Sequence, residues 1–169
     1  PGVQQRFTTT PTEGQKRQYR MLDAIGKRYG VEFDIVDSID SGAANAAYRM
    51  GGRRIVVAAD AAEGAVVQAG VHELVHMLKS TDQAGYEVLQ EVVLNHLTDG
   101  SGGFDLEYSV GQRIRMYAEG GVTLTREAAI EEIVAEAVPT FLTDEKAVAA
   151  FVQRDQTLAE KVRDFFVKF

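Results

Sequence analysis

The stretch His72-Glu73-Leu74-Val75-His76 is the part of the chain from which the fold and the chemistry can be worked out. It has the pattern HExxH and holds two of the three histidines among the 169 residues. Residues four apart share one face of a helix, roughly 6 Å apart at Cβ, so both imidazoles suit neighbouring positions around a zinc ion. Glu73 would then point beside the ion, where its carboxylate can act as a base toward water. We therefore predict a metal-binding helix.

The apolar residues around the motif support a helix over residues 63–79. One side of this helix would pack inward and leave His72 and His76 facing a cleft. The alternative is an ordinary helix that happens to carry two histidines four residues apart. The inward side consists of Val67, Val71, Leu74, Val75 and Leu78.

A third metal ligand has to come from another part of the chain, because hydrolytic zinc sites use three protein ligands and one open position. The predicted helix over residues 126–142 carries Glu132 and Glu136 on the side away from its apolar residues. We expect Glu132 to bind the metal and Glu136 to accept the free N–H of a ligand histidine. Glu131 remains a rival ligand, and all three glutamates could instead form a solvated acidic face.

A ligand directly after the motif is a weaker alternative. The metzincin extension of HExxH would place glycine at 79 and histidine at 82. This chain has Lys79 and Asp82 there, so Asp82 could bind a metal only without the glycine that turns the chain.

Residues before the motif predict a small sheet. We expect residues 1–14 to be a flexible lead-in, followed by a helix from Thr12-Glu13 to about Arg28 that ends at Gly30. Strands are predicted at 31–36, 46–49 and 54–58, with a hairpin turn at Gly51-Gly52.

Residues after the motif predict helices almost to the end of the chain. A few strands followed by many helices place the fold in the α+β class. We expect a single domain over residues 15–169, with a small N-terminal twisted sheet, the HExxH helix and a mainly helical C-terminal half. The further helices are predicted at 84–97, 105–119, 126–142, 144–152 and 154–167.

Composition narrows the function classes. With no cysteine, any metal must be held by histidine and carboxylate side chains. A net charge of -7 argues against generic binding to nucleic acid, and the short apolar runs argue against a membrane span. The chain begins Pro1-Gly2-Val3 without methionine, which is typical either of a processed chain or of a piece of a larger parent protein that could contribute neighbouring domains. No targeting segment indicates a compartment, which would be the cytoplasm if the protein is bacterial or phage-encoded.

HELVH together with Glu132-x-x-x-Glu136 resembles the gluzincin metallopeptidases, in which HExxH is completed by a downstream ExxxD. The order of elements from residue 30 to 142 is similar to the zincin-like domains in large polyvalent proteins of phages and conjugative elements. This resemblance implies His72, His76 and Glu132 as zinc ligands and Glu73 as the general base. Glu136 stands where the family usually has aspartate. The resemblance also implies a sheet edge within Tyr48–Ala58 along which an extended peptide could pair.

The expected function is therefore zinc-dependent hydrolysis of peptide bonds in a peptide or protein substrate, with Glu73 taking a proton from a zinc-activated water. The alternatives are a catalytically degenerate, metal-stabilised interaction module and a metal-free helical scaffold. The sequence does not single out a residue that stabilises the oxyanion. His96 is expected to be a helix-terminal histidine. The candidates for the oxyanion role are His96, Tyr108, Arg113, Tyr117 and Arg126.

Overall fold

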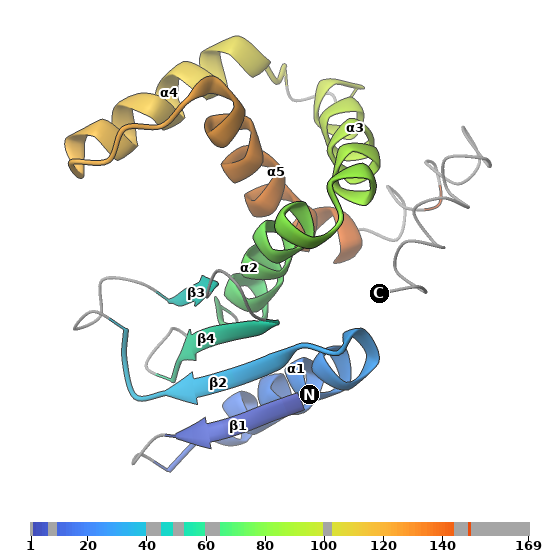
Figure 1. Ribbon diagram of the computed structural model, residues 1–169, viewed down its shortest axis with the longest axis vertical. Helices are drawn as coiled ribbons and strands as arrows, with labels where there is room; N and C mark the ends of the chain where they lie inside the picture. Colours follow the sequence, from blue (N-terminus) through green and yellow to red (C-terminus); the bar gives the residue numbers. More distant parts are fainter. Residues whose placement is uncertain are drawn as a thin grey trace. The chain divides into compact units, whose positions relative to one another are not determined.

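The computed structural model describes residues 2–6, 10–39, 45–48, 53–59, 65–99, 103–143 and 149. The chain divides into two compact units, of which the first runs to Thr81 and the second begins at Asp82 (Figure 1). We call them the sheet unit and the helical unit.

The sheet unit is built on a four-stranded mixed sheet with the order β1-β2-β4-β3. β1, β2 and β4 run parallel, and β3 pairs antiparallel with β4. Both β1 and β3 are therefore edge strands, each with one unpaired side in the described part of the sheet. The strands are β1 (Gly2–Arg6), β2 (Glu32–Val36), β3 (Ala46–Tyr48) and β4 (Arg54–Ala58).

Two helices, α1 (Glu13–Tyr29) and α2 (Ala65–Thr81), pack on the sheet. α1 contacts β1 and β2, α2 contacts β3 and β4, and the two helices contact each other. Alternate residues of β2 and β4 point toward the helices, where they pack against buried residues of α1 and α2 and form the core. The fully buried members include Leu22, Phe33, Ile35, Ile55, Val57, Val66 and Met77.

Gly70 sets how closely α2 approaches α1. A Cβ added at Gly70 would lie 2.8 Å from a methyl carbon of Leu22. The side of α2 buried in the sheet unit therefore centres on Val66, Gly70 and Met77, whereas Val67 and Val71 are only half-buried. Of the predicted inward residues, Val75 and Leu78 are buried. Val67 and Leu74 are partly buried and pack against the core of the sheet unit, and Val71 is half-buried. The prediction missed Gly70, because a glycine that permits close helix contact carries no hydrophobic signal.

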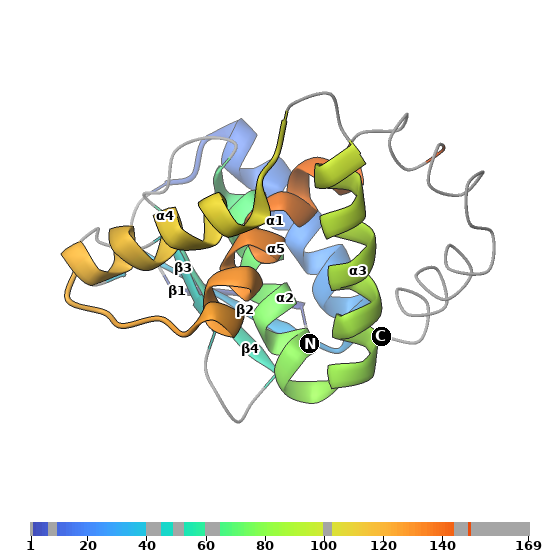
Figure 2. The same cartoon turned by 90° about the horizontal axis from the view of Figure 1, so that it is seen from above.

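The helical unit contains α3 (Gln83–Asp99), α4 (Leu106–Glu119) and α5 (Arg126–Thr143). α5 packs against both α3 and α4 (Figure 2). Asp82 caps α3, since its Oδ1 accepts a hydrogen bond from the N–H of Gly85 at 3.0 Å. Asp105 caps α4 in the same way through the N–H of Tyr108. These caps satisfy amide groups that a helix N-terminus leaves without a partner.

The structure confirms the α+β class and every predicted helix that falls within the described residues, with ends shifted by no more than two residues. Thr12 caps α1 through a capping box with Gln15, and Gly30 ends it in the left-handed conformation. The predicted helices over 144–152 and 154–167 lie outside the described residues, as does the turn at Gly51-Gly52.

The expected flexible lead-in over residues 1–14 differs from the structure, because Gly2–Arg6 forms the edge strand β1. A polar sequence with one valine does not predict a strand, but an edge strand can be held by main-chain pairing with its neighbour. Among the described helices, none has the length and apolar character needed to cross a membrane.

Candidate functional site

The two motif histidines lie side by side on α2. Their Nε2 atoms are 3.0 Å apart and their ring centroids 4.8 Å apart, and both side chains are half-buried. Two nitrogens bound to one tetrahedral zinc at about 2.0–2.1 Å are separated by about 3.3 Å. The pair observed here is therefore close to the spacing that two neighbouring zinc ligands need, as the four-residue interval predicts.

The carboxylate of Glu73 is held by the main chain of the sheet edge. Its Oε2 accepts a hydrogen bond of 2.7 Å from the backbone N–H of Tyr48 on β3. The N–H of Ala58 donates to the carbonyl of Asn45, so Asn45 faces β4 and, by alternation, the N–H of Tyr48 faces away from it. The Tyr48 N–H on the unpaired side of β3 therefore donates to Glu73 and holds its carboxylate in position.

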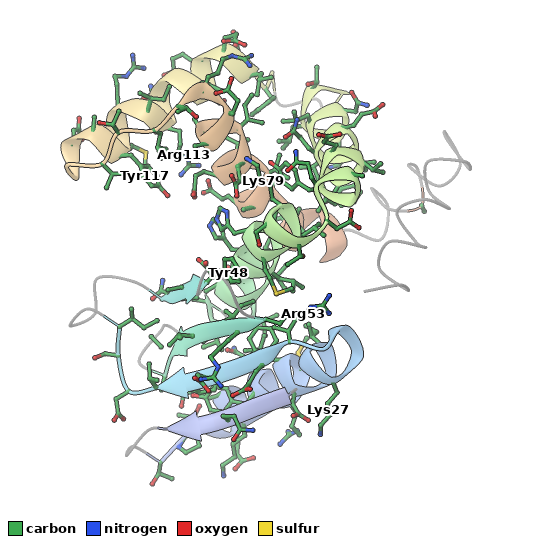
Figure 3. All side chains as sticks on the ribbon, viewed as in Figure 1. Lys27, Tyr48, Arg53, Lys79, Arg113 and Tyr117 are labelled. Carbon is green, nitrogen blue, oxygen red and sulfur yellow. The ribbon has the colours of Figure 1, made fainter. Side chains whose placement is uncertain are left out.

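Tyr48 also contacts α2 through its side chain. Its hydroxyl lies 2.9 Å from the hydroxyl of Ser80, which donates to the carbonyl of Met77 (Figure 3). The edge strand is therefore joined to the motif helix at two places one and a half to two helical turns apart. This explains why three residues of β3 can hold the glutamate in place.

Glu132 lies on α5 of the helical unit and is half-buried. Its Oε2 accepts a hydrogen bond of 2.8 Å from the hydroxyl of Tyr117 on α4. Burial raises the pKa of Tyr117 to about 12, and the hydrogen bond and negative charge of Glu132 act in the same direction. Tyr117 therefore keeps its proton at neutral pH and acts as a donor that orients this carboxylate.

The neighbouring glutamates of α5 have different surroundings. Glu136 is exposed, and its carboxylate accepts a hydrogen bond from Arg113. Glu131 is half-buried, and its charge, with that of Glu132, adds to the burial that raises the pKa of Tyr86. The orientation of the Glu132 carboxylate is therefore set by a tyrosine hydroxyl.

The other candidates have structural partners within the described residues. Asp82, the weaker alternative ligand, serves as the N-cap of α3. His96 lies in the last turn of α3, as predicted, and its ring packs edge-on against Phe141 at a centroid distance of 5.1 Å. Arg126 is exposed and bonded to Glu107.

The sequence indicates Tyr117 only as one of five candidates for the oxyanion role, and it carries no signal for the contact of Tyr48 with Glu73. Arg113 and Tyr117 are four residues apart, so they share the side of α4 that meets α5 (Figure 3). The four-residue spacing indicates that Arg113 and Tyr117 share one side of α4. The sequence does not show that this side contacts the glutamates of α5.

Comparison with protein-family models, with curated proteins and with solved structures finds no match to this chain.

Proposed function

We propose that this chain is a zinc-dependent peptidase domain of the gluzincin type, in which His72, His76 and Glu132 bind the metal and Glu73 is the general base. The observation that carries the proposal is the 3.0 Å separation of the two Nε2 atoms, with a positioned glutamate between the histidines in the chain. An incidental histidine pair on a helix requires neither feature.

The donor chemistry supports zinc. Two imidazole nitrogens and one carboxylate oxygen, all from half-buried side chains, form a set that could hold a metal ion. Zinc in hydrolytic sites takes this set and keeps one position open. We prefer Glu132 as the third ligand because it belongs to this donor set, and the hydroxyl of Tyr117 fixes its carboxylate. Such bonds to a ligand raise metal affinity by holding the ligand in its binding orientation.

Bound zinc would supply a Lewis acid that polarises the scissile carbonyl and acidifies water. Glu73 would accept a proton from the attacking water on its carboxylate and return it to the leaving amine as the C–N bond breaks. The bond from Tyr48 holds Oε2 of Glu73, so the edge strand β3 sets the direction of that carboxylate. An extended peptide would pair with the remaining main-chain groups on the side of β3 away from β4.

One observation favours a second candidate, a metal-stabilised interaction module without hydrolysis. Glu73 has a structural partner in the N–H of Tyr48, so its presence does not by itself require catalysis.

Glu73→Gln distinguishes the two candidates. We expect the variant to retain about one zinc per chain but to lose cleavage of an unfolded protein substrate, because glutamine cannot accept the proton. Glu91→Gln on an exposed part of α3 is the matched control and should keep both properties. If Glu73→Gln cleaves as fast as the parent protein, the hydrolytic proposal is wrong. If neither protein cleaves while both bind zinc, the interaction module is the correct function.

A further inference from the structure

An open groove of about 330 Å³ lies within the helical unit. It is formed by the end of α3, the residue Phe104 before α4, and facing sides of α4 and α5. Its volume is at the lower end of the range of ligand-binding pockets, which suits side chains of a bound segment better than a large cofactor.

The walls of the groove are mainly apolar and partly exposed. Tyr108 and Met116 are 63% and 56% exposed, although both are large and apolar. Leu97 and Phe104, which also line it, are half-buried, and Ile133 is buried. Apolar side chains grouped in this way around a hollow are typical of an interaction site, whereas single exposed hydrophobic residues are ordinary.

The two charged side chains that line the groove are paired with each other. Arg113 and Glu136 form an ion pair, and the side chain of Gln112 donates to the hydroxyl of Tyr108. The groove itself is therefore neutral, so its charge preference comes from the helices around it.

Those helices are strongly acidic. Residues 82–143 contain eleven Asp and Glu but only three arginines and no lysine, whereas residues 1–81 contain nine acidic and ten basic residues. Two of the three arginines, Arg113 and Arg126, are paired with glutamates. The negative charge of the chain is thus concentrated in the unit that carries the groove, and its field favours cationic ligands.

We propose that this groove binds a cationic amphipathic segment of a polypeptide, with an apolar side chain inserted between α4 and α5 and flanking Lys or Arg residues over the acidic helices. If the groove also selects the substrate for cleavage, that part of the proposal rests on the proposed peptidase function. Glu136 and Arg113 line the groove, and Glu132 and Tyr117 lie one helical turn from them on the same sides of α5 and α4. A segment in the groove would therefore lie beside the carboxylate that the peptidase proposal assigns to the metal.

Binding can be measured by fluorescence anisotropy with the full chain carrying Glu73→Gln, which prevents cleavage. The probe is a labelled peptide of about ten residues containing leucine and lysine, and the comparison peptide has glutamate in place of lysine. We expect the glutamate peptide to bind at least about tenfold more weakly, and the lysine peptide to weaken as salt rises from about 50 to about 500 mM. Equal binding of both peptides would overturn the proposal.

Met116→Asp tests the apolar part of the groove without reducing the negative charge. We expect it to weaken binding of the lysine peptide about tenfold, because the burial of an apolar side chain is lost. Val122→Asp is the matched control, since Val122 is 49% exposed and does not line the groove. If both variants bind the peptide as tightly as the parent, the peptide binds elsewhere and the inference is wrong.

The two proposals fail in distinguishable ways. If the lysine peptide binds through Met116 but no peptide is ever cleaved, the groove stands and the peptidase proposal fails. If the unmodified chain cleaves unfolded protein with no preference for sites near Lys or Arg, and Met116→Asp leaves that cleavage unchanged, the peptidase proposal stands and the groove proposal fails.

Discussion

Replacing Glu73 by alanine measures how strongly the edge strand and the motif helix are joined. The carboxylate accepts one partly buried hydrogen bond of 2.7 Å from the N–H of Tyr48. A hydrogen bond to a charged group contributes about 1.5–3 kcal/mol, and a neutral one about 0.5–1.5 kcal/mol. Glu73→Ala removes the acceptor, so the free energy that protects this amide should fall by about 1.5–3 kcal/mol. Glu73→Gln retains an acceptor oxygen and should cost only about 1 kcal/mol.

Amide hydrogen exchange at Tyr48, followed by NMR, reads this contact directly. The calculated loss corresponds to exchange about ten to a hundred times faster in Glu73→Ala, with a smaller change in Glu73→Gln. Amides of α5 should be unaffected in both variants, because the bond lies within the sheet unit. Unchanged exchange at Tyr48 in Glu73→Ala would refute the inference that β3 holds this carboxylate.

Four further predictions concern zinc affinity, pH dependence, a histidine ligand and the contact between helices. Tyr117→Phe should lower zinc affinity about 10- to 100-fold in a competition titration, since Glu132 loses the bond that orients it. The folded protein raises the pKa of Tyr117 to about 12, so the contribution of this residue to the free energy of unfolding is present below pH 10 and is lost as pH rises toward 12. Between pH 10 and 12, the free energy of unfolding measured by urea denaturation should therefore fall less in Tyr117→Phe than in the parent protein. His76→Ala should remove the fall in melting temperature that a chelator causes in the parent protein; zinc at 100 times its Kd stabilises by about 2.7 kcal/mol. Gly70→Ala should destabilise the sheet unit by about 1–2 kcal/mol in thermal unfolding. Its Cβ would lie 2.8 Å from a methyl carbon of the fully buried Leu22, and this overpacking outweighs the gain of about 1 kcal/mol in helix propensity. A melting temperature equal to the parent's would contradict that packing.

Local patterns were sufficient where the interaction itself is local. The capping box of Thr12 and Gln15, the end of α1 at Gly30, and the pairing of His72 with His76 all involve residues within four positions or a single backbone angle. Periodicity predicted α5 across Pro139, and α5 does continue through that residue. Such features follow from the geometry of one helix, and no knowledge of the tertiary fold is needed.

Features that depend on distant pairing could not be predicted in this way. β1 forms because Gly2–Arg6 pairs with β2, and its polar sequence does not predict this pairing. The packing role of Gly70 requires knowing that Leu22 lies opposite. The polar neighbours of Glu73 and Glu132 come from β3 and α4, which are distant in the chain.

The candidate site was predictable in composition but not in its supporting contacts. The HExxH pattern specified which residue types could bind a metal, and α2 gives the histidines the spacing that zinc requires. Glu136 was expected to support a ligand histidine; within its own unit it bonds Arg113, so the family's usual role for that position stays a prediction. The choice of Glu132 over Glu131 gains support from Tyr117, which the sequence did not distinguish from four other candidates.

Anomalous X-ray scattering at the zinc edge, from crystals of protein purified without added metal, tests the metal centre most directly. The proposal predicts one peak about 2.0–2.2 Å from the Nε2 atoms of His72 and His76 and from a carboxylate oxygen of Glu132. A fully occupied zinc bound to other residues, or crystals with no zinc peak although free zinc was available during growth, would contradict it.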